Sequence, residues 1–108
     1  MREAIVVMVT CADDSQAEKI ADCLVRERLA ACASIAGPVH SIFRWQGAVR
    51  RESETLLLMK TRAESFEKLA RRVKELHSYE VPEIIALPII DGSPDYIAWV
   101  LESTAGAG

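Results

Sequence analysis

Hydrophobic and polar positions divide the first third of the chain into a strand pattern followed by a helix pattern. Residues 4–9 form a short, continuous apolar run rich in β-branched side chains, which predicts a central strand buried on both faces. From Asp13 to about Ala30, apolar side chains recur at helical spacing with charged residues between them. Asp13 and Gln16 have the spacing of a capping box, so this stretch is predicted to be an amphipathic helix.

Residues 32–45 and 48–60 are predicted to form a long β-hairpin. Gly37-Pro38 interrupts the first arm and indicates a bulge or bend, and Gln46-Gly47 is the predicted turn. Each arm runs to about a dozen residues, although strands commonly have about five or six. Arms of this length should extend beyond the core and expose strand edges, which favours pairing with other copies of the chain.

A second amphipathic helix is predicted after the hairpin. Thr61 and Glu64 have capping-box spacing, and the apolar positions that follow repeat with helical period up to Leu76. The segment HSYEVPE, residues 77–83, then ends the helix. Pro82 favours extended geometry in the residue before it, so a strand is expected next.

The last elements are a strand over residues 83–90 and a short helix. Pro88 cannot donate a ladder hydrogen bond, so this strand is predicted to lie at a sheet edge or to place Pro88 at an unpaired position. Ser93-Pro94 has the chemistry of an N-cap and first turn, which predicts the final helix. Residues 103–108 are expected to be a frayed tail.

The order of the predicted elements defines a fold class. Two split βαβ halves joined by a hairpin make a ferredoxin-like βαββαβ arrangement of the α+β class, here with a short C-terminal helix. Right-handed crossovers place both long helices on one face of an antiparallel sheet. The sequence contains neither repeats nor linkers, so residues 1–108 are predicted to form a single domain.

Composition excludes some partners. The 108 residues are half hydrophobic and carry a formal net charge of −3. Nucleic-acid-binding domains need a concentrated basic patch, so no nucleic-acid partner is expected. The longest apolar runs are far shorter than the roughly 20 residues that span a membrane, and the N-terminal run is too short for a signal peptide. The chain is therefore predicted to be cytoplasmic, without a membrane partner.

Three cysteines, Cys11, Cys23 and Cys32, form no CxxC pair and are expected to be reduced thiols. Cys23 and Cys32 are interpreted as small buried hydrophobic residues. Cys11 follows a strand and precedes a helix N-terminus, a position that exposes a sulfur and lowers the pKa of a thiol. Cys11 is therefore the candidate functional thiol.

The segment 77–83 carries the other candidate chemistry. His77 and Glu83 could supply an imidazole and a carboxylate which, with a thiol, suit Cu(II) or Zn(II) better than Mg(II). Their spacing has no intrinsic ligand geometry, and a histidine at a helix C-terminus can instead interact with the last carbonyls. No metal or cofactor is expected to be required for folding. No nucleophile, base and acid converge in the sequence, so an enzyme is not predicted.

Five separated segments together resemble a known family: ERLAACASI, SIFRWQG, LLLMKT, HSYEVPEIIALPI and DYIAWV. In order and spacing, over about residues 5–102, they are similar to the CutA divalent-cation-tolerance proteins. The resemblance implies a ferredoxin-like protomer, a homotrimer with interlocking hairpin arms, and a role in tolerance of copper and other divalent cations.

The resemblance also implies a copper site made by a Cys, a His and a Glu. His77 and Glu83 match the family's His and Glu, whereas Val9 stands at the position of its Cys. Cys11 lies two residues further on, on the same side of an extended strand. Ser78 replaces a proline that is common in the family.

Three functions are consistent with these residues. The first is a trimer that binds copper or another divalent cation through His77 and Glu83, with or without Cys11. The second is a signalling scaffold similar to PII-type proteins, which would bind a small anionic ligand in clefts between subunits lined by Trp45, Lys60 and Tyr79. The third is a structural trimer whose effect on metal tolerance is indirect.

Overall fold

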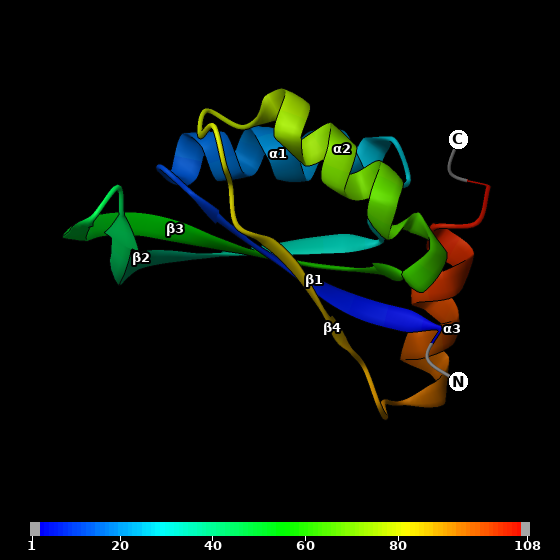
Figure 1. The fold of residues 1–108 in the computed structure, drawn as a ribbon. Coiled ribbons are helices and arrows are strands. Elements are labelled where there is room, and N and C mark those ends of the chain that lie inside the picture. The colour runs from blue at the N-terminus through cyan, green and yellow to red at the C-terminus, as the bar shows by residue number, and fades with distance from the viewer. Residues whose placement is uncertain (1–2, 107–108) are drawn as a thin grey trace.

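The computed structural model describes residues 3–106, which form a four-stranded antiparallel sheet in the order β2-β3-β1-β4 (Figure 1). The strands are β1 (Ala4–Cys11), β2 (Cys32–Trp45), β3 (Ala48–Arg62) and β4 (Ile84–Pro88). The helices are α1 (Asp14–Arg26), the 3-10 helix η1 (Ala63–Ser65), α2 (Phe66–Leu76) and α3 (Pro94–Ser103). Both α1 and α2 cover the same face of the sheet, and α3 lies at one end. The predicted ferredoxin-like α+β fold is confirmed.

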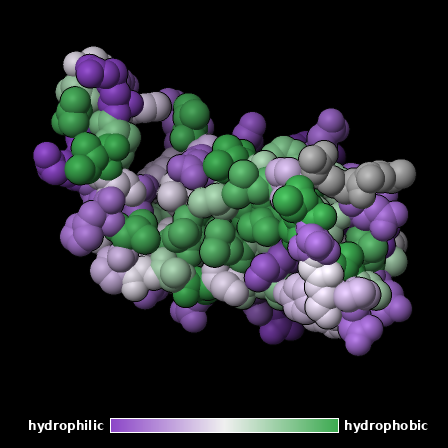
Figure 2. Space-filling view, turned by 90° about the horizontal axis from the view of Figure 1, so that it is seen from below, coloured by the Kyte–Doolittle hydropathy of each residue, from purple (hydrophilic) through white to green (hydrophobic). Residues whose placement is uncertain are grey.

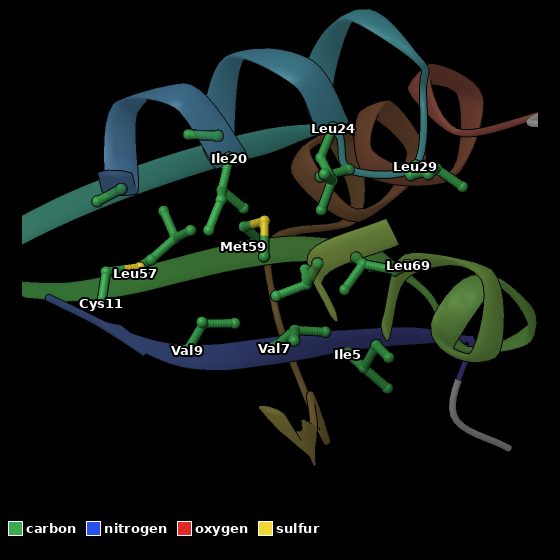
Figure 3. Packing of buried hydrophobic residues seen from close by; sticks show 14 residues of the cluster. Ile5, Val7, Val9, Cys11, Ile20, Leu24, Leu29, Leu57, Met59 and Leu69 are labelled. Atoms are coloured by element: carbon green, nitrogen blue, oxygen red, sulfur yellow. The ribbon is translucent and has the colours of Figure 1, made fainter. Parts of the chain in front are cut away.

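The hydrophobic core lies between the sheet and the two long helices. Alternate residues of β1 point toward the helices, as the two-residue period of a strand requires. Figure 3 shows side chains of both helices pointing at this face of the sheet. The fully buried members include Val7, Val9, Leu57, Met59, Ile20, Leu24 and Leu69. Each buried aliphatic side chain of this size stabilises the fold by about 1.5–3 kcal/mol.

The opposite face of β1 differs from the prediction. β1 is central, as expected, but Val6 and Met8 are half-exposed and not buried. The reason is that both long helices of the described chain lie on the other side of the sheet (Figure 1). The apolar run in β1 therefore has one face in the core of this chain and one face open.

The start of α1 is as predicted. The side chain of Asp13 accepts a hydrogen bond of 2.9 Å from the Gln16 backbone N–H. Gln16 Oε1 accepts in turn from the backbone N–H of Ala12, at 3.1 Å. The first bond satisfies one of the backbone donors that a helix N-terminus leaves free, and the second satisfies the N–H of the residue before the N-cap.

The predicted end of α1, near Ala30, is wrong. The helix ends at Arg26, and Arg28 adopts the left-handed region with φ 64°. The Leu29 N–H then donates to the Leu24 carbonyl at 2.9 Å, which closes a Schellman motif. This motif usually carries glycine, and because arginine occupies the position the sequence lacks the expected stop signal.

The long hairpin is confirmed. β2 and β3 have 14 and 15 residues, and their register shifts between Ala36 and Val39, where the bulge was predicted. Gln46 and Gly47 have φ of 50° and 80°, as in a type I′ turn. Pairing between β3 and β1 begins at Thr55, so the part of β3 before it is paired with β2 alone among the described strands. This arm projects beyond the helices (Figure 1).

The capping box predicted at Thr61 and Glu64 is wrong. β3 continues through Arg62, η1 follows, and α2 begins at Phe66 without a side-chain cap on Ser65. Thr61 is fully buried on the helix-facing side of β3, and its hydroxyl has no hydrogen-bond partner. Strand pairing overrode the local capping signal here.

The C-terminal elements follow the prediction with two corrections. β4 is an edge strand, as Pro88 indicated, but it spans five residues and not the predicted 83–90. α3 begins at Pro94, although the Ser93 side chain makes no cap hydrogen bond.

The expected frayed tail is ordered at its start. Ser103 ends α3, and Thr104 is buried, donating to the Val100 carbonyl at 2.9 Å. Arg62 also donates to the Thr104 hydroxyl at 3.2 Å, which ties this end of α3 to β3. The last two predicted tail positions, 107 and 108, lie outside the described residues.

Replacing Thr61 with valine should stabilise the protein. The substitution keeps the side-chain shape and removes a buried hydroxyl that has no partner. Such a group costs on the order of 1 kcal/mol or more, so the free energy of unfolding should rise by about 1 kcal/mol. Urea unfolding at fixed protein concentration measures the change.

Thr55→Val is the matched control, because Thr55 lies on the same face of the same strand. Its hydroxyl donates to Asp14 Oδ1 at 2.6 Å, so the same substitution should lower stability. If Thr61→Val were equally destabilising, the Thr61 hydroxyl would have to be satisfied by a buried water.

Candidate functional site

The loop between α2 and β4 is attached to the sheet through His77. His77 caps α2, and its backbone N–H donates to the Val73 carbonyl at 2.8 Å. Its ring is nearly buried, with Nε2 at 2.8 Å from the Thr10 carbonyl oxygen. Nδ1 accepts from the Tyr79 backbone N–H at 3.0 Å. Because a carbonyl can only accept, Nε2 carries the ring proton and donates it to Thr10.

These bonds give His77 a structural role whatever else it binds. Both ring nitrogens are engaged within the chain, so coordination of a metal by either one requires the loss of a hydrogen bond. The net cost of losing such a bond is about 1 kcal/mol, which a metal ligand bond can exceed. His77 thus lies at the C-terminus of α2, as the alternative interpretation expected, but its ring bonds to the Thr10 carbonyl of β1 and not to the last carbonyls of the helix. Its role as a ligand stays a prediction.

Tyr79 connects this loop to β3. Its ring packs on the His77 ring with centroids 4.7 Å apart, and its hydroxyl donates to Glu54 Oε2 at 2.8 Å. Burial raises the pKa of the Tyr79 hydroxyl well above its usual value, and the bond to Glu54 and the charges of Glu54 and Glu52 raise it further. Tyr79 therefore stays protonated and acts as a donor to Glu54.

An open cavity of about 730 Å³ lies beside this contact. Its wall comes from the hairpin arm, the end of β1 and the loop after α2. The lining residues are Thr10, Ser41, Ile42, Phe43, Trp45, Arg50, Glu52, Glu54, Tyr79, Glu80, Val81 and Glu83. The cavity thus combines four carboxylates with aromatic and aliphatic walls, and its volume is typical of small-molecule sites.

The predicted site residues separate into two groups. Trp45, Tyr79 and Glu83 meet in the cavity, although they come from β2 and from the loop. His77 lies behind Tyr79 and outside the lining. Lys60 pairs with Val6 and so faces the open side of the sheet, also outside the lining.

Cys11 does not have the environment expected for a functional thiol. It is the last residue of β1, fully buried in the core cluster beside Val9. The two-residue period places it on the helix-facing side with the other core residues of β1. Burial raises the pKa of the Cys11 thiol to about 11, with smaller contributions from the charges of Glu54 and Asp13. The expectation of an exposed sulfur with a lowered pKa was wrong.

Sequence reasoning missed the acidic residues of the hairpin arm. Glu52 and Glu54 were treated as part of a polar strand half, without a site role. The sequence did contain a sign of their position. Side chains alternate between the faces of a strand, so residues 52 and 54 lie on the same face as Leu56 and Leu58. Within residues 3–106, no three histidine, cysteine, aspartate or glutamate side chains are grouped closely enough to hold a metal ion.

Cys11 should resist alkylation in the native protein. The rise in pKa from 9.0 to about 11 lowers the thiolate fraction at pH 8 about a hundredfold, and burial blocks access. Iodoacetamide labelling followed by peptide mass spectrometry should therefore modify Cys11 at least ten times more slowly than the half-buried Cys23. Labelling in urea provides the control, since both thiols should then react. Equal native rates would contradict the buried placement.

Comparison with known proteins identifies the family. The family described as "CutA1 divalent ion tolerance protein" matches residues 5–103. The divalent-cation tolerance protein CutA of Thermus thermophilus is 50% identical over 99 residues, covering 92% of this chain and 96% of that protein. A chloroplastic CutA of Arabidopsis thaliana is 44% identical, and the match covers 94% of this chain but 56% of that longer protein.

Solved structures agree. The Thermus thermophilus protein superimposes with a TM-score of 0.92 at 49% identity, over 94% of this chain and 99% of that one. CutA1 from Oryza sativa gives a TM-score of 0.93 at 38% identity, over 97% and 96% of the two chains.

These relatives are named for cation tolerance and not for an enzymatic activity. None of the helices described here is both long and apolar enough to span a membrane. By fold and by sequence, the chain belongs to the CutA family of divalent-cation-tolerance proteins.

Proposed function

We propose that this CutA protein acts as a homotrimer that binds copper or another divalent cation with the carboxylates of the cavity, Glu83 foremost. The cavity carries the proposal, because its lining contains four glutamates and, among the described residues, a single arginine, Arg50. Such a surface attracts cations strongly. The names of the relatives connect the family with divalent cations.

The open face of the sheet supports assembly. Apolar side chains cover it, and Figure 2 shows them as a continuous hydrophobic area on the side opposite the long helices. The strand register places Val6, Met8, Leu56, Leu58, Ile85 and Leu87 on this face. Soluble monomers rarely expose so contiguous an apolar patch. The projecting hairpin arm adds unpaired strand edges, which another copy of the chain can pair with.

The candidate metal ligands are the three residues predicted from the sequence, His77, Glu83 and Cys11. Glu83 lines the cavity, whereas His77 lies outside the lining and would have to give up one of its ring hydrogen bonds to bind a cation. Cys11 is the weakest of the three, because its thiol is buried and its pKa is raised. Since no complete ligand group exists within residues 3–106, we propose that side-chain movement or a neighbouring subunit completes the site. The cytoplasm stays the predicted compartment, although the Arabidopsis relative is chloroplastic.

A scaffold for a small ligand is the second candidate. Trp45 and Tyr79, both predicted for such a cleft, line the cavity, whereas Lys60 faces the open side of the sheet. The carboxylates favour a cationic ligand over the small anionic one expected from the resemblance to PII-type proteins. A trimer that binds neither metal nor small ligand would match the third, purely structural function.

A charge on the open sheet face should prevent assembly. Leu58 lies in the middle of this face, so Leu58→Glu would place an unpaired carboxylate inside the proposed interface. The wild-type protein should have the mass of a trimer by light scattering, and the variant the mass of a monomer. Val25→Glu, on the outer side of α1, is the matched control and should leave the trimer intact. A monomeric wild type would refute the trimer.

Copper binding can be assigned to residues by titration. Calorimetry of the tag-free protein with Cu(II) at neutral pH should show saturable binding, and Glu83→Gln should weaken it at least tenfold because a charged ligand is lost. His77→Ala should also weaken it, because the ring supplies a second ligand, whereas Cys11→Ala should have the smallest effect of the three because the thiol is buried. Glu67→Gln, an exposed acid on α2, is the control. Unchanged affinity in Glu83→Gln would exclude the cavity as the metal site.

A further inference from the structure

The loop between β4 and α3 contains Asp91-Gly92, the one place in the chain where a glycine follows an aspartate. Both residues are exposed and lie outside the helices and strands, where the chain turns from the sheet into α3 (Figure 1). The backbone N–H of Gly92 donates to Oδ1 of Asp91 at 2.9 Å. The carboxyl group of one residue therefore lies against the backbone nitrogen of the next.

Packing of α3 is the reason that position 92 needs a glycine. Its φ is not in the left-handed region, so backbone conformation does not require one. A Cβ at this position, however, would lie 3.0 Å from Cδ1 and 3.1 Å from Cγ1 of Ile97, closer than ordinary van der Waals contact. Ile97 packs against the buried cluster around Val100, which holds α3 on the sheet. The seat of α3 thus excludes a side chain next to Asp91.

The same missing side chain leaves Asp91 open to an internal reaction. A backbone nitrogen that attacks the preceding aspartate closes a five-membered ring, and a Cβ on the attacking residue hinders this closure. Gly92 has no Cβ and has the wide conformational freedom of glycine, so its nitrogen can reach Cγ of Asp91. Both groups belong to adjacent residues, so the reaction needs neither a binding site nor access for a partner.

The reaction requires water as its only other reagent. The Gly92 nitrogen forms a bond to Cγ of Asp91, and the hydroxyl of the carboxylic acid leaves with the amide proton as water. A water molecule then adds to the main-chain carbonyl carbon of the resulting succinimide and breaks its bond to nitrogen. The chain now runs through the former side-chain carboxyl. The product is an isoaspartate with the same composition as the original protein.

The other four aspartates of the chain are less suited to this reaction. Asp13 caps α1, and Asp14, Asp22 and Asp95 lie within helices. The regular backbone of a helix keeps each nitrogen away from the preceding Cγ. Each of these aspartates is also followed by a residue that carries a side chain. Asp91 is therefore the position at which isoaspartate should form first.

Isoaspartate in this loop would act on α3. It lengthens the backbone by one carbon just before Gly92, so the contact between Gly92 and Ile97 cannot keep its geometry. The other end of α3 has separate attachments, because Arg28 and Arg62 donate to its last carbonyls. The N-terminal half of α3 should therefore loosen while its C-terminal end stays on the sheet.

We propose that Asp91-Gly92 is a site of spontaneous isoaspartate formation, and that this modification releases the N-terminal half of α3. The inference is independent of the metal and small-ligand functions proposed above. The glycine that α3 needs for packing is also the residue that makes Asp91 reactive. Chemical ageing of the protein therefore acts first on the attachment of this helix.

The test is to age the assembled protein at neutral pH, below its unfolding temperature. Peptide separation with electron-transfer fragmentation should show isoaspartate at position 91 forming at least ten times faster than at any other aspartate. Asp91→Asn is the positive control and should react faster than the wild type, because an amide carbon accepts the attack more readily than a carboxylate carbon. Asp91→Glu should not react, because its ring would need six members.

Two results of this experiment would overturn the inference. One is isoaspartate at position 91 that forms no faster than at Asp95. The other is an unreactive Asp91→Asn protein, since the loop would then hold the Gly92 nitrogen away from the side chain. Gly92→Ala should slow the reaction at least fivefold and lower the stability, because its Cβ meets Ile97.

Hydrogen exchange measures the effect on α3. Peptides from the first half of α3 should exchange at least threefold faster in the aged protein than in the fresh protein, with peptides of α1 unchanged. Asp91→Glu aged in the same way is the matched control and should show no change. Light scattering checks that the aged protein remains assembled. Unchanged exchange in α3 after isoaspartate has formed would overturn the proposed release of the helix.

Discussion

The sheet of this protein is covered by helices on one face, and most other features of the molecule follow from that constraint. In β1 and β3, alternate side chains enter a closed core, and the side chains between them lie on an open apolar face. The helices α1 and α2 complete the core but leave the second face without a cover in the described chain. Exposure of so much apolar surface to water is unfavourable, and this open face is therefore the surface on which we propose that other copies of the chain assemble.

β3 joins the core, the cavity and the arm in one strand. Its C-terminal half alternates Leu57 and Met59 into the core. Its N-terminal half leaves the sheet as the hairpin arm and carries Glu52 and Glu54 on the other face. The cavity lies beside the part of β3 that precedes Thr55. There β3 pairs with β2 but, among the described strands, no longer with β1. Two hydrogen bonds, His77 to Thr10 and Tyr79 to Glu54, fix the loop that forms the opposite wall.

Local signals predicted most elements, and they failed where a tertiary interaction replaced them. The Asp13 cap, the Gln46-Gly47 turn and the bulge at Gly37-Pro38 were readable because each depends on a few neighbouring residues. The end of α1 was not, because Arg28 adopts a backbone conformation that usually requires glycine. Its guanidinium donates to the Glu102 carbonyl at 3.2 Å, a contact with α3 that is invisible in the local sequence.

The candidate site shows the same division. The sequence by itself determined the alternation of strands and helices, the long hairpin, and the loop with His77, Tyr79 and Glu83, since these depend on periodicity and short-range chemistry. The tertiary structure decided which side chains meet. It placed Cys11 in the core, because alternate residues of β1 face the helices and Cys11 is one of them, although the loop follows directly. It also brought Glu54 to Tyr79 across 25 positions of the chain, because strand register and loop attachment exist only in the folded protein.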